Sequence, residues 1–181
     1  MRLSRPARRG RVVILGAIAM LLAATGVSAT AGSASAASVG FRLRNYQSWD
    51  CLDASGASSD PGTAAIQWDC HDDVNQAWYE WGDANGRGQL RNWQSGMCLD
   101  IPGGSRSPGA SLVLWPCNNG WNQVWEMREA RGWSCPSGRA VYYINPETGF
   151  ALDNPGGSQA GTQMAAYPYW GGKNQIWCRG A

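Results

Sequence analysis

Three copies of one sequence pattern run along the chain at a period of about 50 residues. Residues 43–45 (Leu-Arg-Asn) precede residues 51–53 (Cys-Leu-Asp), and both triplets return at 90–92 and 98–100, a shift of 47. A third, more divergent copy has Ala-Leu-Asp at 151–153. Self-similarity at a fixed period indicates repeated copies of one supersecondary unit, so the fold must contain that unit three times.

Each copy continues with the same features. A Gly/Ser-rich turn follows the Asp, and a short apolar segment ending in an aromatic residue comes next, as at residues 65–68 (Ala-Ile-Gln-Trp). The copy closes with Gln-x-Trp, which places one tryptophan at the same register in all three: Trp78, Trp125 and Trp177. A threefold core needs a large apolar side chain from each copy, so we expect these indoles in the core.

The segments between the turns are too short for helices. Apolar residues come in runs of three to five, bounded by Gly and Pro, and show no helical spacing, which predicts strands and an all-β fold. A period of about 50 would also fit a propeller blade, but three blades are too few to close. A barrel with four strands per repeat fits better, with repeats at about 39–86, 87–134 and 135–181, and closure removes edge strands.

The first 36 residues follow the pattern of a secretory signal peptide. Five arginines and no acid lie within residues 2–11, an apolar run covers about 12–28, and residues 34–36 form an A-x-A cleavage motif. The apolar run is short for a stable membrane span. We expect a signal peptide at 1–36 and a secreted mature domain at 37–181, without a membrane span. The Arg8-Arg9 pair leaves the export route open between the general and the twin-arginine pathway.

Removal of the signal reverses the net charge. The whole chain has 15 basic and 13 acidic residues, and five of the basic residues lie in the signal, which leaves 10 − 13 = −3. No basic cluster remains to neutralise a phosphate backbone, so nucleic-acid binding is excluded as a leading function. A mature length of roughly 145 residues fits one domain, with no space for a separate catalytic domain.

Six cysteines, all in the exported part, indicate three disulfides. The first two repeats each hold a pair separated by 19 residues, whereas Ala151 and Tyr169 stand at these positions in the third. The register therefore predicts the pairs Cys51–Cys70, Cys98–Cys117 and Cys135–Cys178, with aromatic packing by Tyr169 and Trp170 in place of the missing bridge. Zinc is a weaker alternative, because these separations and a single histidine do not suit a zinc site. We expect no metal and no cofactor.

The repeated Cys-Leu-Asp, Trp-x-Cys and Asn-Gln-x-Trp motifs resemble those of the ricin B-chain-type β-trefoil lectins, the ricin-like carbohydrate-binding modules. The resemblance extends over about residues 39–179, and three Gln-x-Trp motifs in register with three Asp make it specific. It implies a β-trefoil that binds sugars at shallow sites, one per repeat. It also implies that the partner is a carbohydrate or polysaccharide.

The resemblance assigns four site positions to each repeat. The Asp accepts hydrogen bonds from adjacent sugar hydroxyls, the aromatic residue before the second Cys position stacks on the sugar ring, the Asn contacts hydroxyls, and the Gln braces the Asp. These positions are Asp53, Trp68, Asn75 and Gln76; Asp100, Trp115, Asn122 and Gln123; and Asp153, Tyr167, Asn174 and Gln175. The chemistry is sound, because carboxylates accept strong bonds from hydroxyls and the C–H face of a sugar is apolar.

The same residues also have structural interpretations. From spacing alone, Trp68 and Trp115 fit a core position as well as a binding platform. Aspartate often caps turns, but capping does not explain why each Asp is matched by an Asn-Gln pair about 22 residues later. His71 occurs in one repeat only, so we interpret it as a loop residue.

Three function classes remain, in order of preference. The first is a secreted, monomeric, non-catalytic lectin module with up to three sites for galactose- or xylose-type sugars. The second is a trefoil scaffold for protein binding or inhibition, which has no reason to keep the site residues in every repeat. The third is a small glycoside hydrolase, which needs a pair of facing carboxylates. The only acids in threefold register lie on separate repeats, which disfavours this class.

Overall fold

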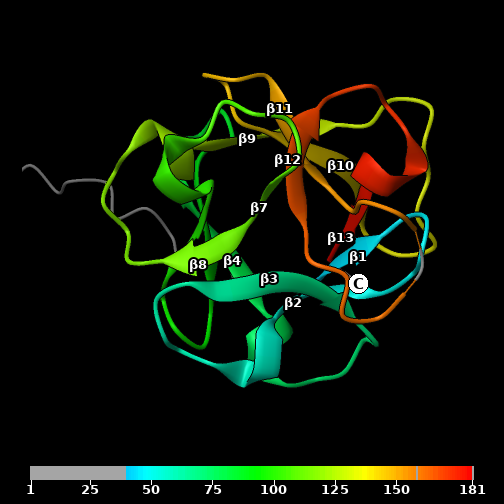
Figure 1. Ribbon diagram of the computed structural model, residues 1–181. Helices are drawn as coiled ribbons and strands as arrows, with labels where there is room; N and C mark the ends of the chain where they lie inside the picture. The colour runs from blue at the N-terminus through cyan, green and yellow to red at the C-terminus, as the bar shows by residue number, and fades with distance from the viewer. Residues whose placement is uncertain (1–39, 158, 181) are drawn as a thin grey trace, which may run out of the picture. The chain divides into compact units, whose positions relative to one another are not determined.

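The computed structural model describes residues 40–157 and 159–180, so the predicted signal peptide lies outside the described residues (Figure 1). These residues form strands and short 3-10 turns, and no helix among them is long and apolar enough to cross a membrane. The all-β prediction is confirmed. The strands are β1 (Leu43–Asn45), β2 (Cys51–Ala54), β3 (Thr63–Trp68), β4 (Trp78–Gly82), β5 (Arg87–Asn92), β6 (Cys98–Asp100), β7 (Ala110–Ser111), β8 (Val113–Trp115), β9 (Trp125–Glu129), β10 (Arg139–Ile144), β11 (Phe150–Asp153), β12 (Ala165–Pro168) and β13 (Trp177–Arg179).

The first and last strands of each repeat close into a barrel. Antiparallel pairing joins β4 to β5, β5 to β9, β9 to β10, β10 to β13 and β13 to β1. A bridge between Phe41 and Trp78 closes the ring between β1 and β4. Because every strand of this ring has a neighbour on both sides, the barrel has no free edge.

The middle strands of each repeat form a hairpin. These hairpins are β2–β3, β6–β8 and β11–β12. They contact one another through β3 with β8 and β7 with β12, and in Figure 1 β7 leads into β8, which lies beside β3. A closed barrel of six strands with three hairpins in threefold register is the predicted β-trefoil.

The third strand of the second repeat is split into β7 and β8, which raises the expected twelve strands to thirteen. Leu112 lies at the break, and its backbone bonds to both other repeats: Ala65 N–H donates to Leu112 O, and Leu112 N–H donates to Met164 O. Met164 N–H donates to Ala65 O, which completes a ring of three hydrogen bonds between equivalent residues. The three repeats are therefore locked together at the pseudo-threefold axis.

The repeated tryptophans occupy the core as predicted. Trp78, Trp125 and Trp177 are fully or almost fully buried. Each indole N–H donates to the carbonyl of the Leu between the Cys and Asp positions, at 2.9, 3.0 and 3.1 Å. The indole therefore fills the core and leaves no buried donor without a partner.

A second repeated contact joins each repeat to the preceding one. The buried Asn that ends the Leu-Arg-Asn segment donates through Nδ2 to a backbone carbonyl in the 3-10 turn of another repeat. Asn45 donates to Asn174 O and Asn92 to Asn75 O, while Asn145 in the third repeat donates to Trp121 O. These bonds pass around the ring in one direction, so each turn is held by the next repeat.

The predicted disulfides are all present: Cys51–Cys70, Cys98–Cys117 and Cys135–Cys178, and no described cysteine is free. In the third repeat Ala151 is buried, and the Tyr169 ring stacks on Tyr142 with centroids 4.1 Å apart. The expected aromatic packing is therefore correct for Tyr169. It is wrong for Trp170, which is 65% exposed because it lies over Gly172 outside the core.

One partly buried ion pair crosses the barrel. Arg179 on β13 binds Glu80 on β4 through Nε and Nη2, at 3.2 and 3.1 Å. The buried Tyr143 hydroxyl on β10 donates to Glu80 Oε1 at 2.7 Å. The Arg179 guanidinium also lies 3.9 Å from the Phe41 ring centroid. Three strands that are distant in sequence thus share one carboxylate.

Candidate functional site

Each repeat holds a buried aspartate at or next to the end of its second strand. Oδ2 of this Asp accepts two side-chain hydrogen bonds, one from Nδ2 of the Asn and one from Nε2 of the Gln in the following 3-10 turn. These turns are η2 (Val74–Gln76), η4 (Trp121–Gln123) and η5 (Lys173–Gln175). The Asn bonds measure 2.9 Å in all three repeats. The Gln bonds measure 2.8, 2.7 and 2.8 Å.

The glutamine amide is fixed by the backbone as well. Its Oε1 accepts the N–H of the residue after the second Cys position, at 3.0 Å from His71, 2.9 Å from Asn118 and 2.9 Å from Trp170. Its Nε2 also donates to a backbone carbonyl at 3.0 Å in every repeat. Because all three glutamines are fully buried, they brace the aspartates and are not positioned to contact a ligand.

The aspartates keep one oxygen unused. Within residues 40–157 and 159–180 no protein donor bonds to Oδ1 of Asp53, Asp100 or Asp153, whereas Oδ2 is occupied in each. Burial raises the pKa of all three carboxyls above the ordinary value of 3.8, and the bonds from Gln and Asn oppose the rise. A carboxylate with one braced and one free oxygen is an oriented acceptor for a ligand hydroxyl.

The proposed stacking residues lie on the surface. Trp68, Trp115 and Tyr167 are each 45% exposed, so a core position for the two tryptophans is wrong. In the hairpin register they lie opposite Cys51, Cys98 and Ala151, two residues from the Asp on the partner strand. The structure thus brings the Asp, the aromatic residue, the Asn and the Gln together in every repeat.

The first two of these positions open into clefts. The cleft of the first repeat measures about 400 Å³ and is lined by Asp53, Trp68, His71, Asp73 and Asn75 among others. That of the second measures about 610 Å³ and is lined by Asp100, Trp115, Asn118, Trp121 and Asn122 among others. Gly62 of the first repeat also lines the second cleft. The wall is therefore shared between repeats.

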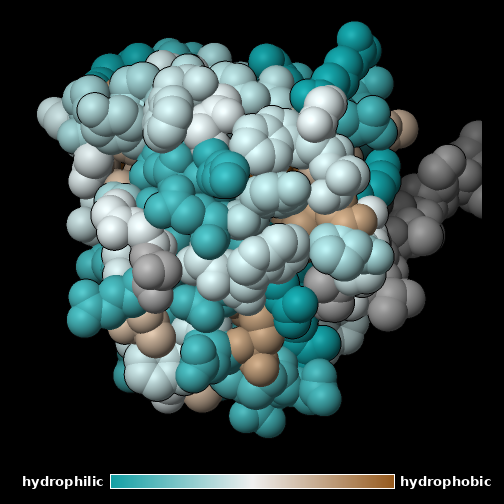
Figure 2. Space-filling view, turned by 90° about the vertical axis from the view of Figure 1, so that its right-hand side faces the viewer, coloured by the Kyte–Doolittle hydropathy of each residue, from teal (hydrophilic) through white to brown (hydrophobic). Residues whose placement is uncertain are grey.

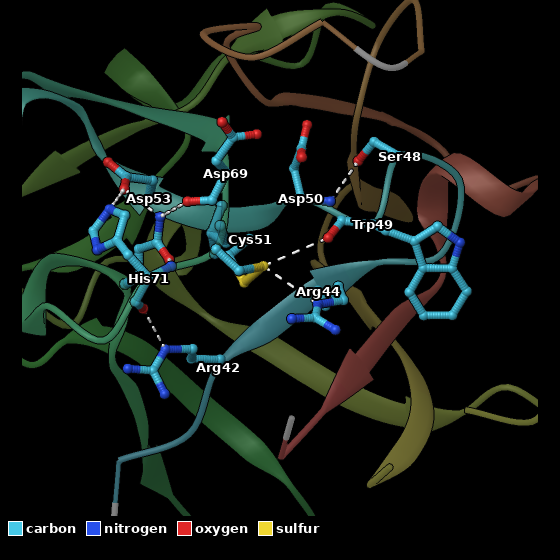
Figure 3. Close-up of a disulfide and its surroundings, with 12 residues drawn as sticks. Arg42, Arg44, Ser48, Trp49, Asp50, Cys51, Asp53, Asp69 and His71 are labelled. Carbon is cyan, nitrogen blue, oxygen red and sulfur yellow. Dashed lines mark hydrogen bonds and ion pairs between the residues drawn. A yellow bond between two sulfur atoms is a disulfide. The ribbon is translucent and has the colours of Figure 1, made fainter. Parts of the chain in front are cut away.

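His71 has a place in the first cleft that sequence reasoning missed. It lies in a loop as predicted, but its Nε2 is 3.4 Å from Asp53 Oδ2 and its Nδ1 is 3.4 Å from Asp73 Oδ2. Figure 3 shows His71 beside Asp53, with Arg42 donating to the His71 carbonyl at 2.8 Å. The Cys51–Cys70 disulfide next to it is flanked by Arg44, whose Nε lies 3.3 Å from Cys70 Sγ. No repeat pattern marks a residue that occurs once.

Trp121 was also missed, because it has no aromatic counterpart in the other repeats. It lines the second cleft together with Trp115.

Among the described residues no group of three or more His, Cys, Asp or Glu side chains could hold a metal ion. The face in Figure 2 is mostly hydrophilic or neutral, with only small, separate hydrophobic areas.

Comparison with known proteins places this geometry in a family. Residues 39–134 match the ricin-type beta-trefoil lectin domain. The designed threefold-symmetric protein ThreeFoil is 27% identical, with a TM-score of 0.70 over 78% of this chain and 98% of its own. No curated protein sequence matches.

Two natural proteins share the fold. A ricin B-like lectin of Macrolepiota procera, solved in complex with lactose, is 24% identical with a TM-score of 0.61, over 78% of this chain and 94% of its own. An exo-β-1,3-galactanase of Clostridium thermocellum is 24% identical with a TM-score of 0.70, over 78% of this chain but only 30% of its own. The trefoil thus occurs both as a separate lectin and as a part of a longer enzyme.

Proposed function

This chain belongs to the ricin-type β-trefoil lectin domain family, and from that premise we propose that it is a secreted, non-catalytic lectin with three sugar-binding sites. The observation that carries the proposal is the identical bracing of Asp53, Asp100 and Asp153. A fold alone needs no such repeated, half-used carboxylate beside an exposed aromatic ring.

Each side chain has a separate task in a cleft. The free Oδ1 of the Asp accepts hydrogen bonds from two neighbouring hydroxyls of one sugar ring, and these bonds are strong because the acceptor is charged. The exposed face of Trp68, Trp115 or Tyr167 takes the C–H face of the ring and buries apolar area. The Asn donates one amide hydrogen to the Asp and the other to a backbone carbonyl, so it holds the Asp together with the Gln.

The sugar we propose is of galactose or xylose type. The lectin from Macrolepiota procera was solved with lactose, and the similar galactanase acts on a galactan, which favours the galactose type. Secretion is supported by three disulfides, which persist in oxidising compartments. We propose that residues 1–36 are the signal peptide and 37–181 the mature domain.

The test removes one carboxylate at a time from the mature protein. Asp53→Ala, Asp100→Ala and Asp153→Ala are compared by calorimetry with lactose and by retention on galactose resin and insoluble xylan. Each should lose one site, and the triple variant should lose binding entirely. Glu129→Ala, an exposed acid on β9 outside the two clefts, is the control and should bind normally. Full binding by the triple variant would refute the proposal.

We propose that the third site works although it lacks the disulfide. Asp153 keeps both bracing bonds, and Tyr167 is as exposed as the two tryptophans. Asp153→Ala should therefore weaken polysaccharide binding as much as Asp53→Ala does. Unchanged binding, with losses in the other two variants, would show that the third repeat serves only as scaffold.

Three linked sites also predict much tighter binding to a multivalent ligand. Sites on one rigid body gain from effective concentration when a polymer spans them, by about 10²–10⁴-fold. We expect much tighter binding to a polysaccharide than to its monosaccharide in calorimetry, and equal affinities would contradict a multivalent lectin.

A further inference from the structure

The second cleft has two aromatic walls, whereas the first has one. Trp121 is the first residue of the 3-10 turn η4, directly before the Asn that braces Asp100. The equivalent residues of the other repeats are Val74 and Lys173. Trp121 lines the second cleft beside Trp115, but Val74 does not line the first.

The fold makes room for this tryptophan. Gly104 faces it so closely that a Cβ at residue 104 would lie 2.9 Å from Cζ2 of Trp121, and the Gly104 φ of +63° also favours glycine. In the first repeat the residues at the equivalent positions are Ala57 and the smaller Val74. Gly104 and Trp121 thus form a matched pair, and the first repeat has neither residue.

The Trp121 ring is held from outside the cleft. The Arg106 guanidinium lies 4.7 Å from the ring centroid, and Arg106 is in turn held by Glu147, with Nη2 2.8 Å from Oε1. Arg106 is not among the residues that line the cleft. The cation therefore covers one face of the indole and fixes its plane. The part of the ring that lines the cleft remains for a ligand.

We propose that the second cleft binds two consecutive sugar rings of a glycan chain, one on Trp115 and Asp100 and the next on Trp121. This inference rests on the proposed lectin function and adds a specificity to one of its sites. The larger cleft, about 610 against about 400 Å³, has room for a second ring. A second aromatic surface buries a second apolar sugar face. The first cleft, which has no tryptophan at the position of Trp121, takes one ring.

The experiment isolates the second cleft by placing Asp53→Ala and Asp153→Ala in the parent. Calorimetry of the parent first tests two ligand pairs, galactose with lactose and xylose with xylotriose. The pair that the parent binds is then used to test the variant. Trp121→Val, which copies the first repeat, should weaken the longer ligand about tenfold, a loss of about 1.4 kcal/mol. It should change the affinity for the monosaccharide less than twofold.

Two results would overturn the inference while the lectin function stands. One is an unchanged affinity of Trp121→Val for the longer ligand. The other is an equal loss for both ligands, which would place Trp121 in the single-ring site. If the parent binds neither ligand pair, while the intact protein also binds none, the proposed function and this inference fail together.

The reciprocal graft covers the case in which Trp121→Val fails to fold. Ala57→Gly with Val74→Trp is built in a protein carrying Asp100→Ala and Asp153→Ala, so that only the first cleft binds. The graft should raise the affinity for the longer ligand relative to the monosaccharide about tenfold. An unchanged ratio in a folded graft would overturn the inference.

Discussion

Gln76 Nε2 donates to Asp53 Oδ2 at 2.8 Å, while Oε1 of the same Gln76 accepts the His71 backbone N–H at 3.0 Å. One buried amide thus holds the carboxylate and the loop behind it. The same double contact recurs at Gln123 and Gln175. Because the amide must donate on one side and accept on the other, no other side chain of this size fits.

Replacing the amide by a carboxylate should therefore damage both binding and stability. Gln123→Glu removes the donor to Asp100 and places two acids in contact, so the free energy of unfolding should fall by about 1–3 kcal/mol at neutral pH. Urea unfolding and calorimetry with sugar would measure both effects. Gln47→Glu, at an exposed turn position, is the matched control and should change neither. Normal binding by folded Gln123→Glu would contradict the bracing role.

Acidification should weaken sugar binding at these sites without lowering the contribution of the three aspartates to the free energy of unfolding. Burial raises the pKa of Asp53, Asp100 and Asp153 above 3.8, so the folded chain takes up these protons at a higher pH than the unfolded chain. Stability from these groups therefore increases as the pH falls through the folded pKa toward 3.8. Binding needs the charged acceptor and should decline over the same range.

Calorimetry at stepped pH, with circular dichroism to verify the fold, would measure this opposition. The expected result is a loss of affinity that begins above pH 3.8 in a protein that is still folded. Full affinity at pH 3.8 would show that the carboxylate charge is not needed for binding.

Loss of one intra-repeat disulfide should destabilise the protein by an amount set by its loop. Cys98 and Cys117 are 19 residues apart, for which chain entropy gives roughly 3 kcal/mol. Cys98→Ala with Cys117→Ala should then lower the Tm by roughly 6–12 °C. Peptide mapping of the unreduced parent should recover the three pairs, and cross-repeat pairing would contradict the structure.

Loss of the Glu80 carboxylate should lower the free energy of unfolding more than loss of an exposed carboxylate. Glu80→Gln leaves Arg179 without its charge partner, and we expect the free energy of unfolding to fall by about 2 kcal/mol. This is less than the full cost of breaking a buried pair because Glu80 is partly exposed. Glu147→Gln removes the exposed partner of Arg106 and should cost about 0–1 kcal/mol. Equal losses in urea unfolding would show that burial adds nothing at Glu80.

Repetition explains why so much could be predicted from the sequence. The core indole at Trp78 and the pairing of Asp53 with Asn75 recur in all three repeats, and the Cys51–Cys70 pair recurs in the second. A recurring residue signals a shared environment. The three copies also predicted four strands per repeat. The split at Leu112 was missed because Ala65 holds the same register in the first repeat, where β3 is continuous, so the repeat pattern does not mark a break.

The residues that sequence reasoning missed are those that break the symmetry. His71 and Trp121 each occur in one repeat, so no comparison within the chain singles them out. Glu80 and Arg179 lie 99 residues apart and meet only when the barrel closes. The exposure of Trp68 depends on its place at the end of β3, which the residue type does not determine. The threefold pattern thus predicts the scaffold, whereas residues present in only one repeat make the sites differ from one another.

The glycines that border the platforms come from a different repeat. Gly62 of the first repeat faces Trp115 of the second, and Gly161 of the third faces Trp68 of the first. The platforms of the first two repeats therefore each lie against a glycine of another repeat, even though each repeat carries its own Asp, Asn and Gln. A peptide of one repeat would have to assemble as a homotrimer to place such a glycine against its platform. A gene duplicated in tandem would preserve that trimer's sites while freeing each copy to change separately.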